Sequence, residues 1–226
     1  MRFTGSALVL LLTASALGAA EVPIERYYMT LFGAQSVPPR TSQTHTWATF
    51  VRTHTTGAGE IVVAVDTVSW MPADLKIRAW ALRRQPGVNL TFDETIDWIA
   101  SFGGRVSSWG PYEIDADRYG RFLSRKADLE SGTIAYRALG AVTFKSRVSN
   151  CGQSFARSSP IVGRRYLQPT PSPGETGTSK LAERYLKAGA LQDGGAEYPW
   201  LLAATGADRY PMVPRRSGER IPRFVR

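Results

Sequence analysis

Residues 44–52, THTWATFVR, decide the predicted fold, because they carry β-branched and aromatic side chains at high density. The segment 53–60, THTTGAGE, contains two glycines, and residues 61–71, IVVAVDTVSWM, form a second apolar run rich in β-branched side chains. Two such runs joined by a short glycine-containing loop are typical of an antiparallel β-hairpin. Residues 75–82, LKIRAWAL, alternate between two sets of side chains, and this alternation predicts a third strand.

Helical signals follow these strands. Thr91 and Glu94 have the spacing of a capping box, and the apolar residues after them continue at helical spacing. The segment 115–132 predicts a second helix, and residues 133–148 are again rich in β-branched residues. We therefore expect an α+β fold in which an antiparallel sheet packs against helices.

The chain divides into four parts by composition. Residues 1–20 have a positive start, an apolar run and small residues before Glu21, which is the layout of a secretory signal peptide. Residues 21–167 are expected to form the α+β core domain. The segment 168–179, QPTPSPGETGTS, predicts a linker. Residues 180–226 predict a short helical segment that ends in a basic, mobile tail. We expect the protein to be exported, to the periplasm or outside the cell.

The composition restricts the classes of site and partner. A single cysteine excludes a disulfide framework and a zinc site built from several cysteines. With two histidines and no HExxH spacing, we expect no metal and no cofactor. The net charge of +9 favours anionic polymers or a membrane surface as partners of the basic tail. Nucleic acid is not expected, because no recognition motif is present and the chain is expected to be exported.

Cys151 and His45 are the candidate catalytic residues. Asn150 is a good N-cap residue, so the sequence predicts a short helix that begins beside Cys151. A thiol at a helix N-terminus lies near free backbone N–H groups, which stabilise a thiolate. A histidine nearby serves as the base and acid that acyl transfer requires. The alternative is that Cys151 is a small packing residue without reactivity.

The two motifs HTWATF (45–50) and NCGQSF (150–155) resemble the histidine strand and the cysteine helix of the permuted papain-like fold. That arrangement is found in lecithin retinol acyltransferase relatives and in permuted NlpC-type peptidases. The resemblance implies that Cys151 is the nucleophile and His45 the general base and acid. A third polar residue on the neighbouring strand then orients the imidazole, and Asp66 and Ser69 are the candidates. We favour Asp66, because a carboxylate accepts the imidazole N–H.

Two functions are consistent with these features. The first is an exported cysteine hydrolase or acyltransferase that acts on an amide bond or an ester bond, such as an envelope peptide or a lipid ester. The alternative is a non-catalytic exported module that binds an anionic envelope component, including a papain-like scaffold without activity.

Overall fold

The hairpin predicted around residues 44–71 lies at one edge of the main sheet in the computed structural model. Strand β2 (Thr44–Thr55) pairs antiparallel with β3 (Ile61–Val68). Strand β1 (Glu25–Gln35) pairs with β2 along its whole length on the other side. These pairings confirm the predicted hairpin. The structure describes residues 25–55, 61–141, 147–160, 162, 174–193, 198 and 200–222.

The rest of the sheet comes from segments far apart in the sequence. Strand β6 (Arg105–Ile114) pairs antiparallel with β1, and β10 (Val213–Pro214) lies parallel to β6, which gives the order β10-β6-β1-β2-β3. Strand β9 (Gln192–Asp193) pairs with another part of β6. The fold is therefore α+β as expected, but its sheet is mixed and not wholly antiparallel. Two small sheets lie outside it, formed by β4 (Trp70–Pro72) with β5 (Gly87–Asn89) and by β7 (Ala135–Tyr136) with β8 (Val148–Ser149).

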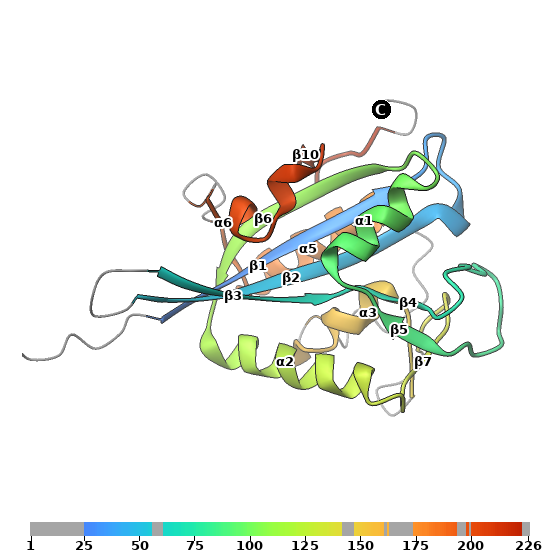
Figure 1. Ribbon diagram of the computed structural model, residues 1–226, viewed down its shortest axis with the longest axis horizontal. Helices are drawn as coiled ribbons and strands as arrows, with labels where there is room; N and C mark the ends of the chain where they lie inside the picture. Colours follow the sequence, from blue (N-terminus) through green and yellow to red (C-terminus); the bar gives the residue numbers. More distant parts are fainter. Residues whose placement is uncertain are drawn as a thin grey trace, which may run out of the picture.

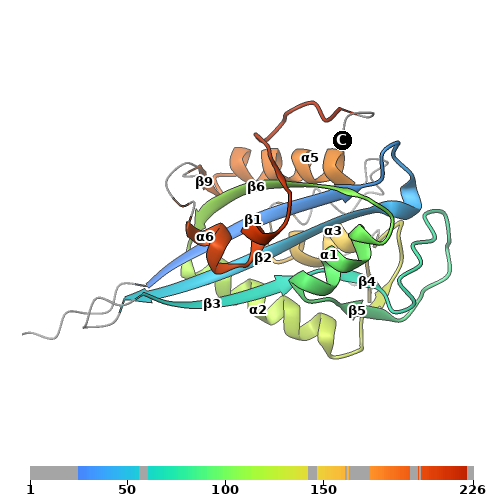
Figure 2. The same ribbon diagram turned by 45° about the horizontal axis from the view of Figure 1, so that its top comes forward.

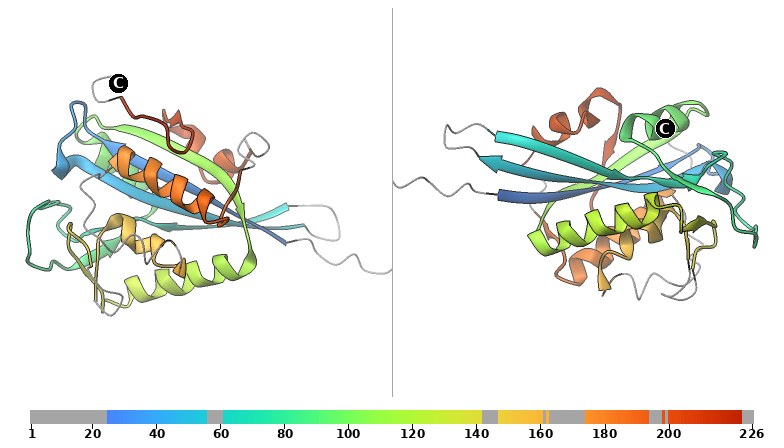
Figure 3. Two further views of the ribbon diagram at one scale, coloured as in Figure 1. Left: turned by 180° about the vertical axis from the view of Figure 1, so that it is seen from behind. Right: turned by 60° about the horizontal axis from the view of Figure 1, so that its bottom comes forward.

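Helices cover both faces of the sheet, as Figures 1 and 2 show. One face carries α1 (Phe92–Ala100), α6 (Trp200–Ala204) and the 3-10 turn η2 (Ala207–Arg209). The opposite face carries α2 (Ala116–Glu130), α3 (Cys151–Ala156) and α5 (Gly174–Lys187), seen from behind and below in Figure 3. A further 3-10 turn, η1 (Thr41–Gln43), leads into β2.

The side chains of β2 alternate between two separate cores, as the period of two in a strand requires. Trp47 packs with Phe32 and the apolar side of α1. Ala48 and Phe50 point the other way and pack with apolar residues of α2, α3 and α5. Both faces of β2 are buried, which explains its continuous run of buried residues from Thr44 to Val51.

Side-chain caps start three helices where the sequence predicts them. The Thr91 hydroxyl accepts from the backbone N–H of Glu94, and the Glu94 carboxylate accepts from the backbone N–H of Thr91, which confirms the capping box of α1. Asp115 caps α2, and the Asn150 amide oxygen accepts from Gln153 N at 2.8 Å to cap α3. These local signals set the helix starts because each cap satisfies a backbone N–H that has no partner within the helix.

The third strand expected over residues 75–82 is wrong. These residues belong to an irregular loop between β4 and β5, which Figure 1 shows projecting from the end of the sheet. The loop turns at once after Pro72, where Leu75 N donates to Pro72 O at 2.8 Å and Leu75 has a left-handed φ of 56°. The alternation in this stretch therefore does not reflect two faces of a strand.

The linker expected at 168–179 is also wrong where the structure describes it. Residues 174–179 form the first turns of α5, and residues 168–173 lie outside the described part. The small residues there allow close contact with the sheet. Thr178 lies over Gly33, where an added Cβ would come within 2.5 Å of the Thr178 hydroxyl. Thr178 Oγ1 donates to Gly174 O at 2.9 Å, and both residues are buried. Because α5 also places Leu181, Ala182 and Tyr185 in the main core, the core does not end at residue 167.

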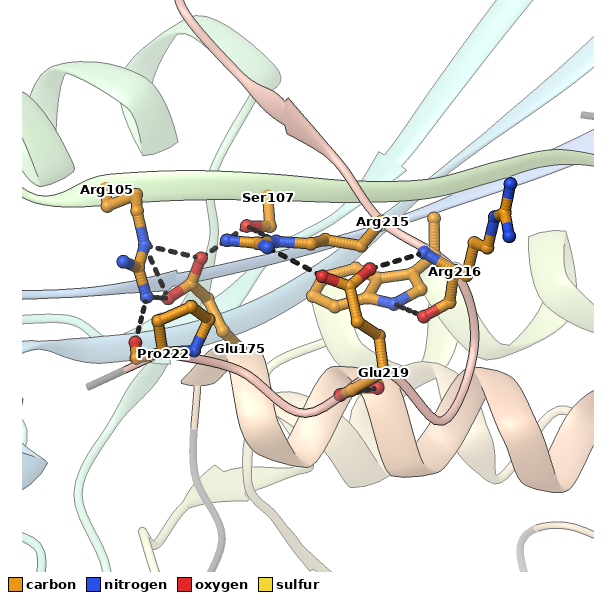
Figure 4. A network of polar contacts seen from close by, with 9 residues as sticks. Arg105, Ser107, Glu175, Arg215, Arg216, Glu219 and Pro222 are labelled. Atoms are coloured by element: carbon orange, nitrogen blue, oxygen red, sulfur yellow. Dashed lines mark hydrogen bonds and ion pairs between the residues drawn. The ribbon is translucent and has the colours of Figure 1, made fainter. Parts of the chain in front are cut away.

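The expected mobile tail is packed against the sheet as far as residue 222, and residues 223–226 lie outside the described part. Arg105 makes a buried ion pair with Glu175 at 2.5 Å, and its guanidinium also donates to Pro222 O at 2.7 Å. Arg215 donates to Ser107 Oγ at 3.2 Å and pairs with Glu219, as Figure 4 shows. These contacts attach the C-terminal segment to both β6 and α5. The part of this segment that the structure describes is therefore not a free basic arm.

The expected signal peptide, residues 1–20, lies outside the described residues. Within the part of the chain that the structure describes, none of the helices is long and apolar enough to cross a bilayer.

Candidate active site

His45 is fully buried near the start of β2, on the face that α1 covers. Its ring is stacked on Trp47 with centroids 5.5 Å apart, and the edge-on Trp98 of α1 lies 5.9 Å away. Burial lowers the pKa of the imidazole to about 3, because a charged ring would lose its hydration there. His45 is therefore a neutral imidazole near neutral pH.

A chain of hydroxyl groups orients the imidazole. His45 Nε2 lies 2.8 Å from Ser69 Oγ, and Ser69 Oγ lies 2.6 Å from Thr95 Oγ1. Thr95 Oγ1 also lies 2.7 Å from Thr91 O, a carbonyl that can only accept. Thr95 Oγ1 donates to Ser69 Oγ, so two tautomers fit the bond between His45 and Ser69: Nε2–H donates to Ser69 in one, and the Ser69 hydroxyl donates to Nε2 in the other. The first tautomer has its proton on Nε2 and a free lone pair on Nδ1, which is the form that a general base at Nδ1 requires.

Ser69 is itself held in place by a side chain from β5. Its backbone N–H donates to Asn89 Oδ1 at 2.8 Å, and the Asn89 amide donates to Thr67 O and to Glu130. Ser69 and Thr95 are both fully buried. Because the hydroxyls are fixed in this way, the imidazole ring has a single orientation.

Cys151 is the first residue of α3 and is partly exposed. Burial raises the pKa of its thiol. The backbone N–H groups of Thr46, Gly152 and Cys151 itself favour the thiolate and oppose this shift in pKa. Tyr136 lies close enough that the negative charge of a Cys151 thiolate adds to burial in raising the pKa of its phenol. The thiol therefore lies in a site that shields it from water but presents several N–H donors.

The thiol lies near the backbone at the start of β2, whereas the imidazole of His45 points to the face that α1 covers, opposite to the face that carries α3. Strand β3 pairs with β2 only from Ala48 onward, so the backbone of residues 44–47 is not paired on that side by β3. The N–H of Thr46 in this stretch favours the Cys151 thiolate, and the nitrogen of Thr46 belongs to the peptide bond with His45. His45 Nδ1 has no hydrogen-bond partner among the described residues, so it is not bonded to the thiol. The two predicted residues are thus neighbours without a direct hydrogen bond.

Asp66 does not occupy the position expected for it. It lies opposite Phe50 in the β2–β3 register and therefore points to the face that α2 covers. Its carboxylate accepts from Tyr119 Oη at 3.2 Å and lies 3.6 Å from Lys126 Nζ. Asp66 and Ser69 are three residues apart, so the two side chains lie on opposite faces. The position beside the imidazole belongs to Ser69, the other candidate.

Two members of the site were not among the sequence candidates, namely Thr95 and Asn89. Thr95 follows the capping box by one residue, and its position on the buried side of α1 could have been read from the helical spacing. No sequence signal points to Asn89, because its role depends on β5 lying beside the end of β3.

Among the described residues, no group of three or more His, Cys, Asp or Glu side chains is placed to hold a metal ion. Comparisons of the chain with protein-family models, with curated proteins and with solved structures found no match.

Proposed function

We propose that the protein is an exported cysteine-dependent hydrolase or acyltransferase, with a permuted papain-like arrangement, that acts on an amide or ester bond. In this proposal Cys151 is the nucleophile, His45 is the general base and acid, and Ser69 orients the imidazole. An envelope peptide or a lipid ester is the proposed substrate class.

The observation that carries the proposal is the position of Cys151 at the start of α3, which packs against β2, the strand that carries His45. It holds the nucleophile beside the peptide bond of His45, whose Nδ1 is unpaired and whose Nε2 is bonded to Ser69. A histidine that served only as packing would have no need of an unpaired, buried nitrogen, which costs free energy. A nearby thiol gives this nitrogen a proton to accept.

The reaction follows from these positions. Nδ1 of His45 takes the thiol proton while the sulfur of Cys151 attacks the carbonyl carbon of the substrate. The negative charge that develops on the carbonyl oxygen needs N–H donors, and the N–H groups around the sulfur are the candidates. The imidazolium then gives its proton to the leaving nitrogen or oxygen, and an acyl-thioester remains on Cys151. Water or a second acceptor nucleophile takes the acyl group and regenerates the thiol.

The pKa shifts describe the resting state of this pair. Burial raises the pKa of the thiol and lowers that of the imidazole, so both groups are neutral before substrate binds. The proton must therefore move during the attack and not beforehand. Catalytic hydrogen bonds are often long in the absence of substrate and shorten in the complex, so the proposal requires the thiol and Nδ1 to approach each other when substrate binds.

The same observations favour one alternative, a scaffold of this arrangement without activity. A thiol with a raised pKa and no bonded base reacts slowly. The alternative differs from the proposal in one measurable respect, because an inactive scaffold does not form an acyl-thioester.

The test is the reaction of the protein with p-nitrophenyl esters of short and medium acyl chains. We expect a burst of p-nitrophenolate and an acyl group on Cys151, detected by mass spectrometry of the peptide that contains it. The burst disappears in Cys151→Ala and slows at least tenfold in His45→Ala, the loss expected when a general base is removed. His54→Ala is the matched control, because His54 is the other histidine of the chain and lies at the far end of β2. An acyl adduct at another residue, or equal rates for the two histidine variants, contradicts the proposal.

A further inference from the structure

The loop between β4 and β5, residues 73–86, combines exposed apolar side chains with a cluster of cations. Trp80 and Leu82 are each 76% exposed, the highest values among the large hydrophobic residues that the structure describes as exposed. Water-exposed tryptophan and leucine lose favourable free energy unless another surface covers them. Their placement on a projecting loop, seen in Figure 1, leaves both free to meet a partner.

Cations surround these two side chains. The loop contains Lys76, Arg78, Arg83 and Arg84, all exposed, and its one acid is Asp74, which pairs with Arg78 at 2.7 Å. The three arginines line a cavity of about 390 Å³. A cavity lined by guanidinium groups is suited to a phosphate-bearing group, since arginine forms bidentate hydrogen bonds with phosphate oxygens.

The loop is anchored, so the exposure of Trp80 and Leu82 is not a result of a loose segment. Ile77 is buried and packs against Met71 and Leu90 in a small separate core. The two ends of the loop are joined by a bond from Ala73 N to Pro86 O at 2.9 Å. Trp98 Nε1 of α1 donates to a backbone carbonyl of the loop, that of Leu75, at 3.3 Å. The fold thus holds the loop while the two apolar side chains stay outside.

We propose that residues 73–86 form a docking site for an anionic lipid surface, with Trp80 and Leu82 entering the interface and Arg78, Arg83 and Arg84 binding lipid phosphates. Tryptophan is favoured at the boundary between lipid headgroups and acyl chains, and cations beside it add electrostatic attraction. A soluble polyanion would account for the arginines but would leave Trp80 and Leu82 exposed. The observations therefore favour a membrane over a polymer. This surface is separate from the Cys151 chemistry and does not depend on it.

The first test is binding of the full chain to vesicles, measured by co-sedimentation. We use phosphatidylcholine alone and an equal mixture of phosphatidylcholine and phosphatidylglycerol, and we expect binding to the mixture that weakens with added salt. Replacing Arg78, Arg83 and Arg84 together by Gln should lower the partition coefficient on the order of 100-fold, from the usual contribution of each cation near an anionic surface. Trp80→Ala with Leu82→Ala should lower it about tenfold. The matched control replaces three exposed cations elsewhere, Arg52, Lys187 and Arg216, by Gln.

The second test locates the contact. Vesicles that contain brominated acyl chains quench a tryptophan that enters the interface, and this signal is independent of how other segments bind. We expect the quenching to be lost in Trp80→Phe and retained in Trp200→Phe, which removes another exposed tryptophan.

Three results overturn the proposal. One is quenching that persists without Trp80. Another is a loss of binding in the control charge variant equal to that in the arginine variant. The third is binding to dextran sulfate that matches vesicle binding and is unaffected by Trp80→Ala with Leu82→Ala, which would identify a polyanion site instead.

Discussion

The buried imidazole of His45 makes the stability of the protein depend on pH in a way that one substitution can isolate. In the folded state the pKa of His45 is lowered from 6.5 to about 3, and burial is the cause. In the unfolded chain the ring regains water and its usual pKa. Below pH 6.5 the unfolded state therefore binds a proton that the folded state does not, so stability falls as pH falls from 6.5 toward 3.

The size of the effect follows from the two pKa values. His45 contributes almost no pH dependence above about pH 7.5, since the imidazole is then neutral in both states. At about pH 4.5 the unfolded state is stabilised by protonation by about 2.7 kcal/mol, or two pKa units at about 1.36 kcal/mol each. Carboxylates also titrate in this range, so the effect must be measured as a difference between two chains.

The measurement compares wild type with His45→Gln, whose amide can still donate to Ser69 but does not titrate. Free energies of unfolding come from urea denaturation at several pH values. We expect the advantage of the wild type over His45→Gln to shrink by about 2 to 3 kcal/mol between pH 7.5 and pH 4.5. A difference that stays constant with pH would refute the assignment of His45 as a buried neutral ring, and with it the proposed resting state.

Three further predictions concern the site and the packing. Ser69→Ala should slow acylation of Cys151 by at least tenfold while Asp66→Asn leaves the rate unchanged, because Ser69 and not Asp66 contacts the imidazole; equal effects would restore Asp66 as the orienting residue. Glu175→Gln should lower the melting temperature by about 10 °C, since removing one partner of a buried ion pair costs about 3–5 kcal/mol; Glu183→Gln, in the exposed pair on the same helix, should change it little. Gly120→Ala should stabilise the protein by about 0.5–1 kcal/mol, because this exposed glycine lies inside α2 and an added Cβ meets nothing within 4 Å; urea denaturation that shows a loss would contradict this.

Features of the fold that depend on a few neighbouring residues could be predicted from the sequence. The capping box of Thr91 and Glu94 and the cap at Asn150 each involve residues three apart, so the pattern alone contains the interaction. The segment 168–179 shows the limit of this reasoning. Its glycine, serine and threonine residues are typical of a linker, yet Thr178 is small because Gly33, far away in the sequence, lies against it. Composition cannot distinguish flexibility from close packing.

The candidate site also has parts that the sequence predicts and parts that depend on contacts between distant segments. The pairing of His45 with Cys151 was expected from two motifs and stays a prediction, because the described contacts do not join the thiol to the imidazole. The orienting residue was misassigned because charge was given more weight than geometry. The hairpin was predicted correctly, and a period of two along β3 already separates Asp66 from Ser69. Choosing between them needed the register, which depends on how β2 and β3 pair and not on either strand alone.

The docking loop at residues 73–86 and the region of Cys151 are connected through the backbone, and this connection affects how a substrate would reach the thiol. Near the end of the docking loop, the backbone N–H and the carbonyl of Gln85 both bond to the backbone of Tyr136 at 2.8 Å. The charge of a Cys151 thiolate raises the pKa of the Tyr136 phenol, so Tyr136 lies within electrostatic range of the nucleophile. Figure 1 shows β4, β5 and α3 at the same end of the molecule. Binding through residues 73–86 would therefore bring the end that holds the thiol to the lipid surface. A substrate embedded in that surface, such as a lipid ester, then has a shorter path to Cys151 than one in solution.

The test compares acylation of the protein by long-chain esters in solution and in anionic vesicles. If the vesicles increase acylation and Trp80→Ala with Leu82→Ala removes only this increase, the loop supplies the substrate while the chemistry remains with Cys151 and His45.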